Sequence, residues 1–276
     1  MQQDTTKQIQ DVLSPQRETI PSSALQKRME ALCLCVVIPT YNNRETLAGV
    51  IRDVLQYTSD VIVVNDGSTD DTAAILEGFA GKIEVVSYMP NKGKGYALKC
   101  GFNRAEELGY RGAVTIDSDG QHAASEIETF VMYAAKYPGA LLVGQRTVEG
   151  SMPAKNSFAN KFSNFWFTVQ TASRLNDTQN GFRLYPLAGM KGLRPVSSRY
   201  EAELEMLVRL AWKRVKIISV PTHVYYPPEK VRVTHFRPGR DFFRISALNT
   251  IFFFLAIIYG YPSMFFRWLF TKKGIS

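Results

Sequence analysis

Cysteine is scarce in this sequence: Cys33, Cys35 and Cys100 are the only three among 276 residues. Three thiols cannot form a disulfide framework. Without a Cys-x-x-Cys or a histidine pair, they do not match the ligand spacing of a zinc site either. We therefore expect reduced cysteines that pack as small apolar residues. Reduced cysteines predict a cytoplasmic setting, because oxidising compartments favour disulfides.

Residues 1–30 lack the apolar stretch that a secretory signal contains. They are polar and include Pro15 and Pro21, so we expect a weakly ordered lead-in with a short helix at 22–30. The hydrophobic content of 45% and the charged content of 21% exclude global disorder and collagen-like classes. A chain of this length can bury a full core in one large domain, with or without an appendage.

Two glycine-rich nucleotide motifs are also missing. No GxxxxGK[ST] occurs, which excludes a P-loop kinase or ATPase, and no GxGxxG follows the first apolar run, which disfavours a dinucleotide-dependent oxidoreductase. The glycine-rich opening loop expected of a nucleotidyltransferase is missing from the same place.

Apolar runs alternate with amphipathic segments from residue 32 onward. The runs typical of strands lie at 32–38, 61–64, 83–88, 113–116, 140–144 and 182–186, with two further extended pieces around Pro221. The segments typical of helices lie at about 44–57, 71–80, 94–109, 124–137, 154–175 and 200–214. This alternation predicts an α/β fold with a largely parallel sheet and right-handed crossovers.

Polar clusters follow the predicted strands at their carboxyl ends, where ligands bind in parallel sheets. Residues 39–43 read Pro-Thr-Tyr-Asn-Asn, and residues 65–71 read Asn-Asp-Gly-Ser-Thr-Asp-Asp. Asp66 directly follows a buried strand, where its carboxylate can accept hydrogen bonds from the ring N–H of a base. Helix capping by residues 68–70 is the alternative use of the second cluster, and the two uses are compatible.

The segment Asn91–Gly95, Asn-Lys-Gly-Lys-Gly, opens a predicted helix. Glycines and lysines at a helix N-terminus suit a phosphate, because the backbone N–H groups and the helix dipole both favour an anion. Taken alone, this segment does not identify a ligand.

Two aspartates, Asp117 and Asp119, follow the predicted strand at 113–116 and point the same way from an extended chain. They would repel each other unless a cation lay between them and an anionic ligand. Hard oxygen ligands of this kind suit Mg²⁺ or Mn²⁺ with substrate phosphates. The alternative is two turn aspartates, one of which caps the helix beginning near Ala123.

Residues 33–146 resemble the nucleotide-sugar-binding half of the family 2 glycosyltransferases. The resemblance rests on the order and spacing of Pro39–Asn42, Val63–Ser68, Asn91–Gly95, Asp117–Asp119 and Gly144–Arg146. The nearest branch is that of the polyprenyl-phosphate sugar synthases, similar to dolichyl-phosphate mannose synthase. Its DxDxQH motif is matched by Asp117–His122, and its GFR stretch lies within Asp177–Arg183. The resemblance implies the GT-A fold, a Rossmann-like α/β fold with a mostly parallel sheet flanked by helices.

The same resemblance implies roles for individual residues. Asp119 and Gln121 would hold Mg²⁺ or Mn²⁺ with Asp117 on the metal or ribose side, Asp66 would recognise the base, and Arg146 and Arg183 would contact phosphate. The nucleotide-sugar contacts expected on this basis, to a GDP- or UDP-linked donor, are Pro39, Tyr41, Asn43, Asp66, Lys94, Asp117, Ser118 and Arg146. The candidate catalytic residues are Asp119, Arg183 and Asp177.

The acceptor decides whether a base is needed. A polyprenyl phosphate is already an anion and needs only cations to position it, for which Arg183, Arg237 and Arg240 are the candidates. A hydroxyl acceptor would need a carboxylate base. Asp177 and the row Glu201, Glu203 and Glu205 are available, although alternating glutamates on a helix more often form a solvated surface. We expect His122 to stabilise the metal loop, and we expect in-line attack to invert the anomeric centre.

The C-terminal segment, residues 227–276, is basic and aromatic. It carries +6 of the net charge of +8, and its run from Ile245 to Phe266 contains no Asp, Glu, Lys or Arg. Cations around an apolar stretch suit an anionic membrane surface. Residues 260–262, Gly-Tyr-Pro, interrupt the run. Three arrangements stay open: two interfacial helices or a re-entrant hairpin, one kinked spanning helix, or burial against the catalytic domain or a partner subunit.

The sequence therefore predicts three parts: the lead-in 1–30, a GT-A domain at 31–226, and a membrane-associating segment at 227–276. We expect a metal-dependent, inverting glycosyltransferase that uses a lipid-linked acceptor at the cytoplasmic face of a membrane. A hydroxyl acceptor, in a glycan, a glycolipid or another lipid, is the alternative, and homo-oligomerisation is left open. We expect no nucleic-acid partner, because acidic strand ends repel a phosphodiester backbone. A non-catalytic membrane scaffold would not explain those carboxylates either.

Overall fold

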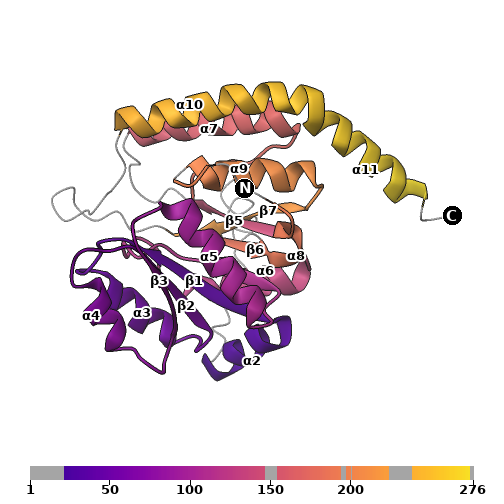
Figure 1. Ribbon diagram of the computed structural model, residues 1–276. Helices are drawn as coiled ribbons and strands as arrows, with labels where there is room; N and C mark the ends of the chain where they lie inside the picture. Colours follow the sequence, from indigo (N-terminus) through magenta and orange to yellow (C-terminus); the bar gives the residue numbers. More distant parts are fainter. Residues whose placement is uncertain (1–21, 147–153, 194–196, 200, 224–237, 274–276) are drawn as a thin grey trace, which may run out of the picture.

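A seven-stranded sheet forms the centre of the computed structural model, and helices cover both of its faces (Figure 1). The structure describes residues 22–146, 154–193, 197–199, 201–223 and 238–273. The strand order is β3-β2-β1-β4-β6-β5-β7, and only β6 runs antiparallel to its neighbours among the pairings of the described residues. The strands are β1 Leu34–Thr40, β2 Val61–Asp66, β3 Glu84–Tyr88, β4 Gly112–Thr115, β5 Leu141–Arg146, β6 Arg183–Pro186 and β7 Ile217–Thr222. The predicted α/β class with a mostly parallel sheet is confirmed.

The helices fill the gaps between strands as the amphipathic periodicity predicts. Within the described ranges they are α2 Ser22–Leu32, α3 Leu47–Leu55, α4 Thr72–Glu77, α5 Lys94–Glu107, α6 Glu126–Lys136, α7 Ala154–Thr171, α8 Leu187–Met190, α9 Glu201–Trp212, α10 Pro238–Leu255, the π-helical η1 Ala256–Gly260 and α11 Tyr261–Lys273. Alternate residues of β1 point into two cores: Val36 and Ile38 pack with α2, α3 and α6, whereas Cys35 and Val37 pack with α5 and α9. This double burial explains why β1 is a continuous apolar run.

The short helix predicted at 22–30 is present as α2. Leu25 and Met29 are fully buried in the core beside α6. Gln26 accepts a hydrogen bond from the N–H of Ser59 and donates one to Asp60 Oδ2 at 2.9 Å. The packed core therefore includes residues that the sequence assigned to the lead-in, while residues 1–21 lie outside the described part of the chain.

The three cysteines are free thiols, as expected. Cys35 is fully buried, and that burial raises the pKa of its thiol above the ordinary value. Such a thiol is an apolar core group rather than a nucleophile.

Helices α10, η1 and α11 follow one another at the C-terminus, and α10 lies side by side with α7 (Figure 1). Phe243–Phe270 is long and apolar enough to cross a membrane by length and composition, and 22% of its most apolar window is buried inside the molecule. The interruption expected at 260–262 appears as the change from η1 to α11 at Gly260–Tyr261.

Candidate functional site

The loops after β1, β2 and β4 meet at the carboxyl edge of the sheet. The N–H of Asn42 donates to Ser68 Oγ at 3.0 Å, which joins the first loop to the second. Asn43 Nδ2 donates to Ser118 Oγ at 2.6 Å, which joins the first loop to the aspartate loop. Because parallel strands end at the same edge, three polar clusters far apart in sequence are held in one place.

Asp66 organises the loop that precedes α5. Its carboxylate accepts hydrogen bonds from Asn91 Nδ2 at 2.9 Å and from the N–H groups of Lys92 and Gly93 at 2.7 and 2.8 Å. A Cβ on Gly67 would collide with the backbone of Asn91, so the close approach of the two loops requires glycine there. Asp66 is only 2% exposed, and both of its oxygens have partners within the chain. The carboxylate therefore positions the loop before α5. Because an ionised carboxylate can accept about four hydrogen bonds, the base contact expected of Asp66 stays a prediction.

Lys94 joins two carboxylates at the start of α5. Its Nζ lies 2.7 Å from Asp117 Oδ1 and 2.9 Å from Glu203 Oε2. Burial opposes the charge on Lys94, but the two carboxylates more than offset this and raise its pKa above the ordinary value. Burial would likewise raise the pKa of Asp117, but Lys94 and, less strongly, His122 hold it below its ordinary value. Lys94 and Asp117 are therefore both charged at neutral pH.

The residues predicted to hold a metal lie on the loop after β4. Asp119 Oδ1 accepts the N–H of Gln121 at 3.0 Å, and both side chains are half-buried. One oxygen of Asp117 is engaged by Lys94. Among the described residues, no group of three or more His, Cys, Asp or Glu side chains is close enough to hold a metal. The donors that do fit Mg²⁺ or Mn²⁺ are carboxylate and amide oxygens, which usually leave coordination positions for phosphate and water.

His122 packs the end of this loop against Phe182. Its ring stacks on Phe182 with the centroids 5.3 Å apart, and its Nδ1 is buried without a hydrogen-bond partner. Burial, reinforced by the charges of Lys94 and Arg146 and partly offset by Asp117, lowers the pKa of His122 to about 4. A neutral, stacked imidazole fits the expectation that His122 stabilises the loop.

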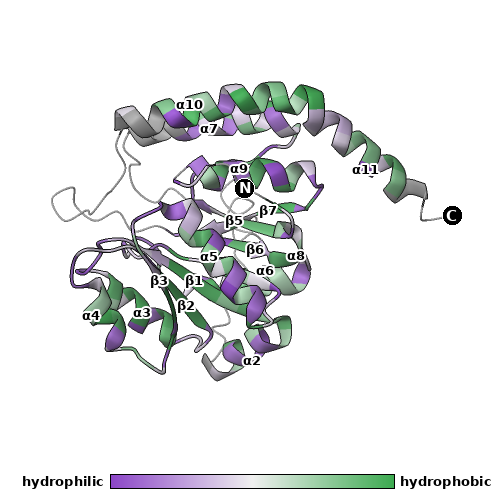
Figure 2. Cartoon of the chain, viewed as in Figure 1, coloured by the Kyte–Doolittle hydropathy of each residue, from purple (hydrophilic) through white to green (hydrophobic). Residues whose placement is uncertain are grey.

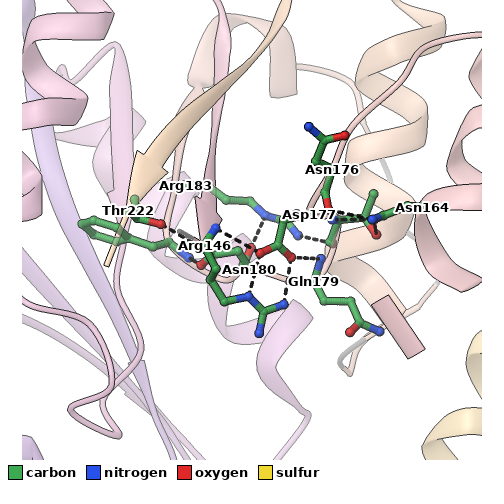
Figure 3. A network of polar contacts seen from close by, with 10 residues as sticks. Arg146, Asn164, Asn176, Asp177, Gln179, Asn180, Arg183 and Thr222 are labelled. Atoms are coloured by element: carbon green, nitrogen blue, oxygen red, sulfur yellow. Dashed lines mark hydrogen bonds and ion pairs between the residues drawn. The ribbon is translucent and has the colours of Figure 1, made fainter. Parts of the chain in front are cut away.

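Arg146 ends β5 and forms a two-point ion pair with Asp177 (Figure 3). Its Nε and Nη2 lie 2.6 and 2.8 Å from the two carboxylate oxygens of Asp177, which is 3% exposed. The fork geometry holds the guanidinium plane in one orientation. Asp177 is thus occupied as an anchor for Arg146, and this pairing argues against the predicted alternative that Asp177 acts as a base.

Arg183 was predicted to contact phosphate and the acceptor, and the structure places it elsewhere. It is 1% exposed, and its guanidinium donates to the backbone oxygens of Asn180, Thr178 and Glu203 at 2.7 to 2.9 Å and to Tyr185 Oη at 3.0 Å. These bonds tie the loop before β6 to α9. These internal partners argue against a direct phosphate or acceptor contact of Arg183, which stays a prediction. The sequence shows the cation but not the carbonyl groups that surround it.

The other predicted acceptor residues are not placed. Arg237 and the side chain of Arg240 lie outside the described part of the chain.

The loop from 176 to 182 is fastened on two further sides (Figure 3). Thr178 Oγ1 donates to Asn164 Oδ1 of α7 at 2.8 Å. Asn180 Nδ2 donates to Thr222 Oγ1 of β7 at 3.2 Å, and its Oδ1 accepts the N–H of Phe182. These hydrogen bonds fix the loop that carries Asp177, and Asp177 in turn holds the side chain of Arg146 in place.

The remaining predicted nucleotide contacts lie around the first loop. Pro39 is buried within β1, Tyr41 and Asn43 are half-buried, and Ser118 is 3% exposed. Asn43 Oδ1 and Thr40 Oγ1, the latter at the end of β1, are both buried and have no hydrogen-bond partner. Unsatisfied buried oxygens are rare in proteins, so these two are candidates to accept hydrogen bonds from a ligand.

The glutamates of α9 are buried, so the expectation of a solvated surface is wrong. Eleven of the twelve residues of α9 are buried, because the helix packs between α5 on one side and α7 and α10 on the other. Glu205 accepts hydrogen bonds from the N–H of Ser197 and from Arg209 Nε. Glu203 joins the Lys94 cluster, a site contact that the sequence prediction missed. The available signal was the apolar residue between and after each glutamate, which is unusual for an exposed helix.

Two kinds of sequence comparison find similar proteins. The sequence model of the family described as Glycosyl transferase family 2 matches residues 35–194. The UDP-N-acetylglucosamine–dolichyl-phosphate N-acetylglucosaminyltransferase of Methanococcus voltae is 27% identical over 213 residues, which cover 69% of this chain and 85% of that protein. The undecaprenyl-phosphate mannosyltransferase of Micrococcus luteus is 28% identical over 198 residues, which cover 67% and 80%.

The fold is similar to that of a solved enzyme. The structure of glucosyl-3-phosphoglycerate synthase from Mycobacterium tuberculosis, in complex with Mn²⁺, UDP and glucosyl-3-phosphoglycerate, superposes with a TM-score of 0.64. The match covers 88% of this chain and 86% of that one at 19% identity, which supports a shared GT-A-like fold and nothing more. With the family model matching more than half of the sequence, the chain belongs to glycosyl transferase family 2 and is a glycosyltransferase.

Proposed function

We propose that the chain transfers a sugar from a UDP- or GDP-linked donor to a polyprenyl phosphate or a similar lipid, with a divalent metal ion and with inversion. The observation that carries this proposal is the arrangement at the carboxyl edge of the sheet. There, the loop after β1 is joined to the aspartate loop by Asn43 and Ser118, and the oxygen donors at 119–121 closely follow Asp117, which is paired with Lys94. The relatives named for dolichyl- and undecaprenyl-phosphate substrates support the choice of acceptor.

The donor would bind with its base against the first loop and its diphosphate toward the aspartate loop. Asn43 Oδ1 and Thr40 Oγ1 offer unsatisfied acceptors for base or ribose donors. Asp119 and Gln121 would hold Mg²⁺ or Mn²⁺, with Asp117 contributing the oxygen that Lys94 does not engage. When bound, the ion would supply positive charge beside the departing phosphate. Arg146, held by Asp177, would add a fixed cation on the same side.

No general base is required for an anionic acceptor. A phosphate oxygen can attack the anomeric carbon without losing a proton, and attack in line with the leaving group inverts that carbon. A hydroxyl acceptor would need a carboxylate to remove its proton. Because Arg146 engages both oxygens of Asp177, we place the hydroxyl acceptor second.

The C-terminal helices have one face that packs on the protein. Asn249 accepts hydrogen bonds from Gln170 of α7, and the Phe252 ring stacks on Trp212 of α9 at 5.3 Å. Gly260 lies against the same indole. These contacts place one side of the helical segment along the catalytic domain.

The opposite face is apolar and open to solvent. Its large exposed side chains are Phe243, Ile251, Phe254, Ile257, Ile258, Phe265, Phe266 and Phe270, and Phe165 of the neighbouring α7 is exposed as well. Figure 2 shows hydrophobic residues along much of α10 and α11, interspersed with polar ones. A helix with one packed and one exposed apolar face suits insertion into a single leaflet better than a crossing, which would separate Phe252 from Trp212. We propose that this surface lies in the cytoplasmic leaflet, where free thiols stay reduced.

Labelled transfer tests the proposal. The full chain is incubated with membrane lipid extract, Mn²⁺ and labelled UDP- and GDP-sugars, and the organic phase is counted with and without EDTA. We expect EDTA-sensitive labelling of lipid with one nucleotide class. Labelling of a water-soluble acceptor alone would favour the hydroxyl alternative, and no labelling with any common donor would contradict the proposal.

A further inference from the structure

One carboxylate oxygen of Glu203, beside the Lys94–Asp117 ion pair, lacks a hydrogen-bond partner. The side chain is 10% exposed, and its Oε2 forms the ion pair with Lys94 at 2.9 Å. Its Oε1 is buried and accepts no hydrogen bond. A buried carboxylate oxygen without a donor is costly, so its presence beside the residues predicted to bind the donor suggests that a ligand supplies the hydrogen bond.

The position of Glu203 is rigid. Its backbone carbonyl accepts Arg183 Nη1 at 2.9 Å, which fastens the first turn of α9 to the buried arginine. The start of α9 also packs tightly on the start of α5. The N–H of Tyr96 donates to Ser198 O at 3.1 Å, and a Cβ on Gly95 would collide with Ala202. Lys94 and Glu203 are therefore held together from both helices.

The charges around Glu203 select the kind of donor that fits. Lys94 is the cation shared by two carboxylates, Asp117 and Glu203. The nearby Arg183 directs its donors to carbonyl oxygens and to Tyr185, so it does not neutralise the second carboxylate by direct contact. Glu203 Oε1 belongs to an ionised carboxylate, which only accepts hydrogen bonds. It therefore fits a neutral hydroxyl, which donates one, and not a phosphate or a carboxylate, which at neutral pH offers no comparable donor.

We propose that Glu203 Oε1 accepts a hydrogen bond from a ring hydroxyl of the transferred sugar, with Lys94 as the positioning residue. This inference rests on the proposed function and narrows it: the donor carries a neutral, hydroxyl-bearing sugar rather than a uronic acid. Glu203 is then a specificity-determining residue of the donor site, next to the loop that faces the diphosphate.

Binding measurements separate the sugar contact from the nucleotide contacts. The full chain is titrated calorimetrically with UDP, UDP-glucose, GDP and GDP-mannose in Mn²⁺ buffer, and the nucleotide pair that binds is kept. Four proteins are compared: wild type, Glu203→Gln, Glu203→Ala and the control Glu106→Gln, which changes an exposed glutamate of α5, the helix that carries Lys94. Thermal unfolding of each variant checks the fold.

We expect both Glu203 variants to bind the nucleotide sugar more weakly. The loss should be roughly 10-fold or more for Glu203→Ala, as for a hydrogen bond to a charged group, and smaller for the isosteric Gln. Affinity for the free nucleoside diphosphate should change less than about twofold, and Glu106→Gln should leave both affinities unchanged. Equal losses for nucleotide and nucleotide sugar would overturn the inference. So would a selective loss of nucleotide-sugar affinity in Glu106→Gln.

Deoxy-sugar nucleotides give a second, independent readout. One deoxy analogue should bind wild type more weakly and should show no further loss in Glu203→Ala, because the same hydrogen bond is already missing. Additive losses for every analogue would overturn the assignment. Unchanged nucleotide-sugar affinity together with lost transfer would mean that Glu203 acts as a base. If wild type binds no nucleotide sugar at all, the proposed function itself fails, and that outcome differs from all of these.

Discussion

The carboxyl edge of the sheet, here called the donor edge, comprises the loops after β1, β2, β4 and β5. It differs from the C-terminal helices in how fully its side chains are engaged within the protein. At the donor edge, short loops are joined side chain to backbone, so that Asp66, Asn43 and Asp177 all have fixed partners. Along α10 and α11, one face packs on the domain and the other exposes rings such as Phe254 and Phe266. The first region is ready for a polar ligand as it is, whereas the second has an apolar surface that water does not stabilise. Under the proposed function, the nucleotide-sugar site would therefore be preorganised, whereas the acceptor side would depend on the surface that covers its apolar face.

The largest expected effect on stability concerns Arg183. The sequence predicts that it contacts phosphate, whereas in the structure it forms hydrogen bonds within the protein. Arg183→Met leaves several buried carbonyl groups without donors, so we expect a loss of at least about 4 kcal/mol in the free energy of unfolding. Urea denaturation measures this loss. The exposed Arg174→Met is the control and should change stability by less than about 0.5 kcal/mol. An Arg183→Met protein of wild-type stability with impaired transfer would restore the phosphate-contact role.

The next effect should appear in catalysis without a matching effect on stability. Asp119→Ala removes an oxygen donor from a half-buried loop, and we expect transfer to fall at least about 100-fold, as when a preorganised charge contact is lost. Stability should change by less than about 1 kcal/mol. Initial rates in the labelled-transfer assay measure the first quantity, with the exposed Asp71→Ala as control. Retained turnover in Asp119→Ala would remove the metal assignment.

Two phenylalanines two residues apart compare the faces of the C-terminal helix. Phe252 is 3% exposed and stacked on Trp212, so Phe252→Ala should destabilise the fold by about 3 kcal/mol. Phe254 is 60% exposed, so Phe254→Ala should change stability by less than about 0.5 kcal/mol.

The same pair tests where the membrane lies. Phe254→Asp should weaken flotation with anionic lipid vesicles while the urea midpoint stays near wild type. If Phe254→Asp binds vesicles like wild type, the exposed face is not the lipid surface. If Phe252→Ala costs nothing, the packing of α10 on α9 is not formed in solution.

The smallest effect is a pH dependence within the donor edge. Burial would raise the pKa of Asp70, but hydrogen bonds from Thr72 and the N–H of Arg44 hold it below the ordinary value of 3.8. The folded state therefore favours the ionised form, and this contribution is present above about pH 4 and is lost as the pH falls through the folded value. Asp70→Asn should cost less than about 1 kcal/mol at pH 7, and the difference from wild type should shrink toward pH 3. A difference that does not change with pH would show that Asp70 acts through packing alone.

The sequence by itself determined the elements and the edge at which the site lies. Apolar runs such as 61–64 became β2, and periodic segments such as 94–109 became α5, because these patterns depend only on neighbours along the chain. The polar residues after β1, β2 and β4 were bound to meet, since parallel strands end at the same edge. The family followed from the same ordered segments.

Only the tertiary structure decided which of these residues are exposed to a ligand and which support other loops. The sequence predicts that Asp66 and Arg183 contact a ligand. In the structure, both side chains form hydrogen bonds with backbone groups that are distant in the sequence. Glu203 looks like surface, but α5 brings Lys94 to it. The direction of the C-terminal helix was equally undecided, because it depends on a tryptophan of α9. In each case the deciding partner is non-local, and local periodicity carries no information about it.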